Sequence, residues 1–125
     1  MKFPEVLGLK VHFKEGGRKL KDWAEKWGFP EPARERLSVL CGLAVKKTID
    51  GMFTGVFDYE EVINGLSAWT ITYGLSEEAI EELAGICDFI FEFTGLAGIP
   101  AEMVDGKVFK FIFNKLKDLI FKKKD

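Results

Sequence analysis

Apolar positions in the middle of the chain recur at the spacing of an amphipathic helix. One stripe consists of Tyr59, Val62, Ile63, Leu66, Trp69 and Tyr73. Asp58 can cap the start of this helix, with Glu61 at the capping-box position, and Gly74 can end it in a left-handed conformation. After Gly74 we expect a second helix with Ser76 as its N-cap and an apolar stripe that continues to Phe93. The pattern predicts a helical hairpin.

The same pattern occurs earlier in the chain. A shift of 46 residues places Trp23–Cys41 on Trp69–Cys87, with seven identities in 19 aligned positions. The identical pairs are Trp23/Trp69, Gly28/Gly74, Glu31/Glu77, Ala33/Ala79, Glu35/Glu81, Leu37/Leu83 and Cys41/Cys87. Chance pairing at ordinary composition would match roughly one position in 19. We therefore expect an internal duplication of about 46 residues, with one hairpin over about 13–53 and a second over about 59–99.

Three further segments complete the predicted architecture. Leu37–Val45 is apolar almost all round, which predicts a central helix. A fifth helix over about 100–123 is expected to close the hairpins as a cap. Leu9–Lys14 alternates like a strand, and the turn-like Val104–Lys107 offers a possible partner for it. The predicted fold is a single all-α domain over 1–125, made of two tandem helical hairpins and a closing C-terminal helix, with a possible short extended segment near the N-terminus.

Composition and charge support one globular domain and add an uneven charge pattern. The chain has 125 residues, of which 47% are hydrophobic, so it can bury its own core. Residues 1–57 carry a net charge of +4, residues 58–105 carry −11 with no Lys or Arg, and residues 106–125 carry +5, which sums to −2. These blocks can be complementary within the fold or between subunits, or they can be solvated helix faces of different sign.

The sequence also bears on where the protein works. Its first residues lack the basic and apolar regions of a signal peptide. The longest charge-free stretch, Val62–Ser76, is shorter than the roughly 20 apolar residues that a spanning helix needs, and it contains several polar residues. We expect a cytoplasmic protein.

Few residues qualify for chemistry. His12 is the single histidine, which excludes a multi-histidine metal site, and no placed nucleophile accompanies it. Cys41 and Cys87 lack C-x-x-C spacing and are interpreted as buried thiols. A two-fold arrangement of the repeats would bring the two thiols close enough to bond, whereas solenoid stacking would hold them roughly 8–10 Å apart.

The acidic pairs Glu77/Glu81 and Glu78/Glu82 each share a helix face, as metal-binding carboxylates would. They also lie in the first turns of a predicted helix, where its dipole favours negative charge, and this explanation is simpler. No glycine-rich phosphate loop or nucleic-acid signature occurs. We therefore predict no catalytic, cofactor-binding or metal-binding residues, no cofactor and no nucleic-acid partner.

The C-terminal helix, residues 108–124, carries the clearest functional pattern. Its apolar face is opposed by lysines, which is typical of a closing helix, of a partner-binding helix or of a helix on an anionic membrane. The leading hypothesis is a non-catalytic protein–protein interaction or assembly module that self-associates. The alternatives are a peripheral binder of anionic membrane surfaces through residues 108–124, and a small-ligand carrier or enzyme with a pocket between the hairpins.

Overall fold

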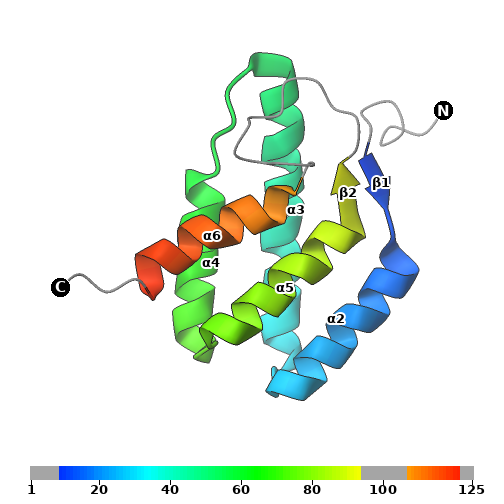
Figure 1. The fold of residues 1–125 in the computed structure, drawn as a ribbon, viewed down its shortest axis with the longest axis vertical. Coiled ribbons are helices and arrows are strands. Elements are labelled where there is room, and N and C mark those ends of the chain that lie inside the picture. The colour runs from blue at the N-terminus through cyan, green and yellow to red at the C-terminus, as the bar shows by residue number, and fades with distance from the viewer. Residues whose placement is uncertain (1–8, 94–106, 122–125) are drawn as a thin grey trace.

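The computed structural model describes residues 9–93 and 107–121 (Figure 1). In chain order the elements are β1 (Leu9–Val11), α2 (Phe13–Trp27), α3 (Glu31–Thr54), α4 (Glu60–Tyr73), α5 (Glu77–Ile90), β2 (Phe91–Phe93) and α6 (Val108–Ile120). Helices α5 and α6 run diagonally in front of α3 and α4, and α2 runs at the side, next to α5 (Figure 1). The five helices of the described residues confirm the all-α prediction and the closing C-terminal helix.

The two tight turns have the same geometry. Gly28 ends α2 with φ 73° and Gly74 ends α4 with φ 66°, in the left-handed region that only glycine adopts without strain. In each turn the amide of the following residue donates to a carbonyl five positions back, at 2.8 Å after Gly28 and 3.1 Å after Gly74. This is the Schellman motif, and it satisfies carbonyls that the helix end leaves open.

The helices that follow these turns also begin alike. Pro30 precedes α3 with φ −76° and ψ 166°, and Ser76 precedes α5 with φ −82° and ψ 165°. The Ser76 hydroxyl accepts a hydrogen bond from the amide of Ala79 at 3.2 Å, which confirms the predicted N-cap. Proline serves at the equivalent position because a helix start leaves its amides without partners in any case.

The main packing joins the first predicted hairpin to the second. Helix α2 packs on α5 and α4 packs on α3, whereas α2 and α3, like α4 and α5, make few close backbone contacts. The Trp23 indole donates to the carbonyl of Ala79 at 3.1 Å, and the Trp69 indole donates to the carbonyl of Ala33 at 2.9 Å. The two indoles stack with their centroids 6.3 Å apart. Such reciprocal contacts are the pattern of a two-fold axis, not of solenoid stacking.

Helix α6 closes the bundle against α5 and α4. Its buried face consists of Val108, Phe109, Ile112, Phe113 and Leu116. Asp88 of α5 accepts the backbone amides of Phe109 at 2.8 Å and Lys110 at 2.9 Å. A carboxylate from another helix therefore caps the start of α6, where both the free amides and the helix dipole favour negative charge.

The central helix is α5, which lies between α2 and α6. The prediction that Leu37–Val45 is central was wrong, because Val39 is 59% exposed and only one side of that segment faces the core. The segment is apolar on every side, but it is buried on one side only. The outward side includes an apolar residue that no described element covers.

The N-terminal strand is present but shorter than predicted. Strand β1 pairs antiparallel with β2, with Leu9 opposite Phe93 and Val11 opposite Phe91. The helix expected to run to Phe93 ends at Ile90, because the alternating residues 91–93 extend to pair with β1 instead. Residues 94–99 of the second predicted hairpin, residues 100–106 of the predicted last helix and most of the turn-like Val104–Lys107 lie outside the described residues.

Candidate docking groove

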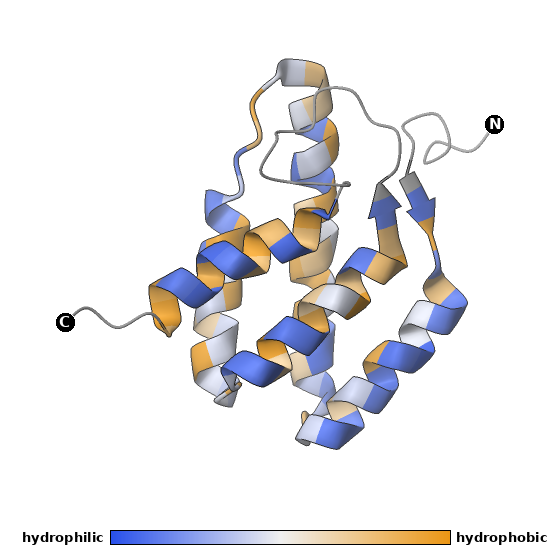
Figure 2. Ribbon diagram, in the orientation of Figure 1, coloured by the Kyte–Doolittle hydropathy of each residue, from blue (hydrophilic) through white to orange (hydrophobic). Residues whose placement is uncertain are grey.

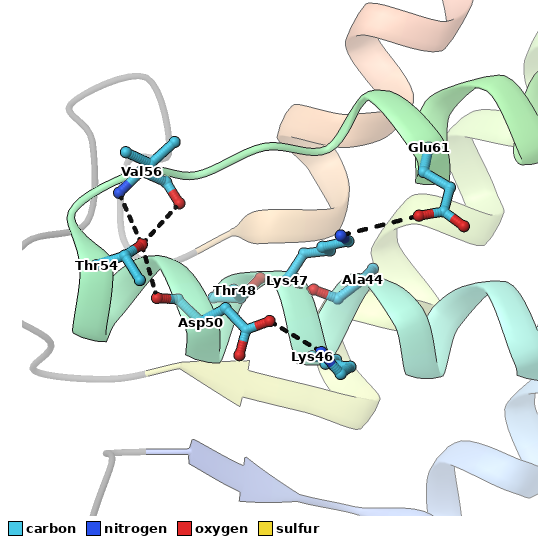
Figure 3. Close-up of polar contacts among 8 residues, drawn as sticks. All are labelled: Ala44, Lys46, Lys47, Thr48, Asp50, Thr54, Val56 and Glu61. Carbon is cyan, nitrogen blue, oxygen red and sulfur yellow. Dashed lines mark hydrogen bonds and ion pairs between the residues drawn. The ribbon is translucent and has the colours of Figure 1, made fainter.

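The connection between α3 and α4 forms one end of an open groove. Helix α3 ends at Thr54 and is capped by Gly55, whose φ is 82°. The Thr54 hydroxyl donates to the carbonyl of Asp50 at 3.0 Å and accepts from the amide of Val56 at 3.2 Å (Figure 3). The connection that follows is apolar at Val56 and Phe57 and becomes polar at Asp58 (Figure 2), and Val56 is 66% exposed. Local hydrogen bonds therefore hold an apolar segment at the surface.

Two aromatic residues fix the connection to the bundle. The Phe57 ring lies so close to Gly51 that a Cβ atom there would collide with it. Tyr59 is buried, and its hydroxyl donates to the Thr48 Oγ1 at 2.6 Å, since the Thr48 hydroxyl itself donates to the carbonyl of Ala44. Burial raises the pKa of Tyr59 to about 12, so the phenol is neutral at physiological pH. Both rings are structural parts of the groove.

The start of α4 differs from the predicted cap. The helix begins at Glu60, and Asp58 Oδ1 accepts the amide of Glu60 at 3.1 Å. Asp58 therefore makes a turn just before the helix, and the capping box expected with Glu61 does not form. Glu61 instead pairs with Lys47 of α3 at 3.8 Å (Figure 3).

The opposite wall is the outer edge of α6. Phe111 meets Tyr59 edge to face, with ring centroids 6.1 Å apart. The Lys115 ammonium lies 5.4 Å from the centroid of the Phe111 ring. One turn further along, Leu119 is 66% exposed. This edge lies beside the buried face of α6 and presents both apolar and charged groups.

Between these walls lies a groove of about 540 Å³ that is open to solvent. Its lining consists of Phe57, Tyr59, Glu60, Ile63, Asn64, Phe111, Lys115, Asp118 and Leu119. The volume is within the roughly 300–1,000 Å³ of ordinary ligand sites. The lining combines apolar and aromatic side chains with Glu60, Lys115 and Asp118, so it offers apolar contact and a charged rim.

The residues that the sequence singled out lie elsewhere. His12 Nε2 lies 3.0 Å from Glu92 Oε1, and the imidazole stacks on Phe89. Cys41 and Cys87 are both buried, with their sulfur atoms 3.7 Å apart. None of these residues lines the groove.

One glutamate of each acidic pair on α5 binds a basic residue. Glu82 accepts hydrogen bonds from Lys26 Nζ at 2.8 Å and Trp27 Nε1 at 3.1 Å, and both contacts lower its pKa. Glu81 pairs with Lys117 of α6 at 2.9 Å. Within the described residues, no three His, Cys, Asp or Glu side chains are placed to hold a metal ion.

The charge blocks are complementary inside the chain. Within the described part of the chain, each ion pair apart from Lys46–Asp50 joins the acidic middle to a basic end. These pairs lie at the surface. The charge blocks are therefore complementary within the fold and also belong to solvated helix faces, the two explanations that the sequence offered as alternatives.

Sequence reasoning missed the groove because its lining comes from two segments about 50 residues apart. One signal was available: Phe111 lies off the centre of the apolar face of its helix. In the structure Phe111 and Phe121 are both half-buried. Most of the apolar face of residues 108–120 is in the core, so only this edge remains for a partner.

Comparison with known proteins gives one partial similarity to report. No family model matches the chain, and no solved structure matches it. A UPF0754 membrane protein of Geobacillus thermodenitrificans (strain NG80-2) is 30% identical over 105 residues, which are 84% of this chain and 25% of that protein. The chain therefore spans about a quarter of the length of this curated relative. None of the described helices combines the length and apolar character that crossing a bilayer requires.

Proposed function

We propose that this chain is a non-catalytic binding module that holds an apolar helical segment of a partner protein in the α4–α6 groove. The observation that carries the proposal is the groove itself. It has a volume of about 540 Å³, lies between two helices, is open to solvent, and has an aromatic floor with charged residues along its rim. An amphipathic helix fits such a site, because its apolar stripe enters the groove while its polar edges meet the rim.

The rim residues suit the polar edges of a helix. Glu60 and Asn64 follow one side of the groove on α4, and Lys115 and Asp118 follow the other side on α6. Leu119 stands at the edge, where an incoming side chain would cover it. Because the floor of the groove is apolar and aromatic, association is expected to depend mainly on apolar contact and only weakly on salt.

Exchanging exposed leucine and isoleucine residues tests the groove. Leu119→Ser changes a residue that lines the groove. Ile71→Ser is the control, because Ile71 of α4 lies outside the groove and is 67% exposed, against 66% for Leu119. The probe is a synthetic amphipathic helical peptide with leucines at i, i+3, i+4 and i+7, titrated into isotope-labelled protein and followed by NMR. We expect shifts to concentrate on residues 57–64 and 111–119, and Leu119→Ser to weaken binding about five- to tenfold.

Ile71→Ser should leave the affinity for the peptide unchanged. Equal loss in both variants, or shifts spread over the whole surface, would contradict a specific groove. Light scattering on the protein alone separates the two kinds of occupant: self-association that Leu119→Ser abolishes identifies a second copy, and a monomer that binds the peptide identifies a different protein.

The second candidate function is binding to an anionic membrane surface. The name of the Geobacillus relative favours it, and so does Phe13, which is 70% exposed at the start of α2 beside Lys14. An exposed aromatic among lysines is a typical interfacial anchor. Co-sedimentation with phosphatidylserine-containing vesicles, compared with neutral vesicles and with Phe13→Ser, tests it, and equal pelleting with neutral vesicles or none at all removes it.

A further inference from the structure

The two cysteines of the chain meet at the interface between the two halves of the bundle. Cys41 lies on α3 and Cys87 on α5, at positions that the 46-residue shift makes equivalent. Their sulfur atoms are 3.7 Å apart, which is direct contact. A disulfide bond is about 2.05 Å long, so the two side chains together need to close a gap of about 1.7 Å.

The thiols lie within a packed core that indole hydrogen bonds hold together. The Trp23 and Trp69 indoles clamp the two halves through their hydrogen bonds to Ala79 and Ala33. These bonds tie α5 to α2 and α3 to α4, and the stacked indoles join the two pairs of helices around the thiols.

The two thiols differ in access. Cys41 is 7% exposed and Cys87 is 1% exposed, so a reagent from solvent meets Cys41 first. The contact with Cys41 and burial both raise the pKa of the Cys87 thiol, so its thiolate is disfavoured. This division of roles, an outer thiol that reacts and an inner one that resolves, is typical of paired redox cysteines.

We propose that Cys41 and Cys87 form a redox modification site, which a small peroxide converts to an intramolecular disulfide between α3 and α5. Cys41 sulfur attacks one oxygen of hydrogen peroxide, which gives the sulfenic acid at Cys41 and releases water. Cys87 sulfur then attacks the Cys41 sulfur, loses its proton and expels a second water. Overall the two thiols lose two electrons and two protons, and one peroxide becomes two waters.

The disulfide would stabilise the fold. It would close a loop of about 46 residues across the interface between the halves, which restricts the unfolded chain. The loop length predicts a rise in melting temperature on the order of 10 °C on oxidation. The bond is reversible, so a dithiol reductant should return the original value.

The test treats the native full chain with hydrogen peroxide, then unfolds it and alkylates any remaining thiols. We expect an intact mass lower by two hydrogen atoms, no alkylation, and a Cys41–Cys87 linked peptide after digestion. Full alkylation, separate sulfinic acids on the two cysteines, a disulfide between two chains, or a disulfide that forms only in urea would each overturn the proposal.

Two single variants test the order of the steps. In Cys87→Ser, the Cys41 sulfenic acid has no resolving partner and should be trapped by dimedone. In Cys41→Ser, dimedone labelling of Cys87 after peroxide treatment should be several-fold slower than that of Cys41 in Cys87→Ser, because Cys87 is the more buried thiol. Faster labelling of Cys87 would overturn the assigned roles, and the wild-type mass measurement decides the disulfide itself even where a variant is unstable.

Discussion

At the scale of single residues, the two tryptophans Trp23 and Trp69 occupy equivalent positions and make equivalent hydrogen bonds. Each indole is 3% exposed and donates to a backbone carbonyl of the other half. Phenylalanine keeps most of the ring but loses the indole hydrogen bond between the halves and leaves a small cavity. We expect Trp23→Phe and Trp69→Phe each to lower the free energy of unfolding by about 1–3 kcal/mol, measured by urea denaturation.

The two losses should be similar in size. The exposed Phe13 offers a control, since Phe13→Ser removes an aromatic that is 70% exposed and should cost little stability. A loss confined to one tryptophan would contradict their equivalence.

The Asp88 carboxyl should make the stability of the fold depend on pH. Burial raises the pKa of its carboxyl from the ordinary 3.8 to about 6, although the amides of Phe109 and Lys110 oppose the rise. The folded chain then binds this proton more readily than the unfolded chain between about pH 4 and pH 6. Ionisation of Asp88 therefore lowers stability as the pH rises through that window, and the loss is complete above it.

Carbon NMR of the Asp88 carboxyl should give a titration midpoint near 6. The Asp88→Asn side chain cannot ionise, so the variant does not lose stability in this way as the pH rises. The free energy of unfolding of Asp88→Asn minus that of wild type should therefore increase by about 1–3 kcal/mol from pH 4 to pH 7. A constant difference between the two proteins across this range would show that the pKa is ordinary.

At the scale of elements, the turns after α2 and α4 are the clearest case of structure set by local sequence. Gly28 and Gly74 both adopt positive φ with open space around the missing Cβ. Gly28→Ala and Gly74→Ala should therefore each cost about 1 kcal/mol from backbone strain alone, measured by thermal unfolding. Gly42, which lies inside α3 and also has open space, is the control, and Gly42→Ala should be neutral or stabilising.

These examples mark what the sequence could predict. Stripes at helical spacing, Gly28, Gly74 and Ser76 predicted the helices and their ends, because those signals are local. Strand β2 was missed because residues 91–93 extend only through pairing with β1, some 80 residues away. The groove was missed for the same reason, since Phe57 and Phe111 meet only in the folded chain. The internal duplication stays a prediction, although the matched turns and indole contacts agree with it.

At the scale of the whole molecule, surface charge is arranged to hold the acidic middle against the basic ends. The pair Glu81–Lys117 joins α5 to α6 at 2.9 Å, and the Lys117 side chain is only 19% exposed. A double-mutant cycle with Glu81→Gln and Lys117→Met should give a coupling of about 0.5–1 kcal/mol at low salt. At 1 M salt the coupling should shrink toward zero, and a coupling that persists would mean that the pair is shielded from solvent.

The reciprocal packing of the two halves also has a consequence for how the molecule could be divided. Because α2 packs on α5 and α4 packs on α3, each of these two contacts joins residues 1–57 to residues 58–125. Residues 1–57 alone would leave the apolar faces of α2 and α3 in water. Residues 58–125 would keep the packing of α6 on α4 and α5 but would expose the faces that α2 and α3 cover, and a mixture of the two fragments could rebuild the bundle without a peptide bond between them. The short connection beside the groove is thus the natural place to cut the chain and ask whether two inert pieces reassemble into one protein.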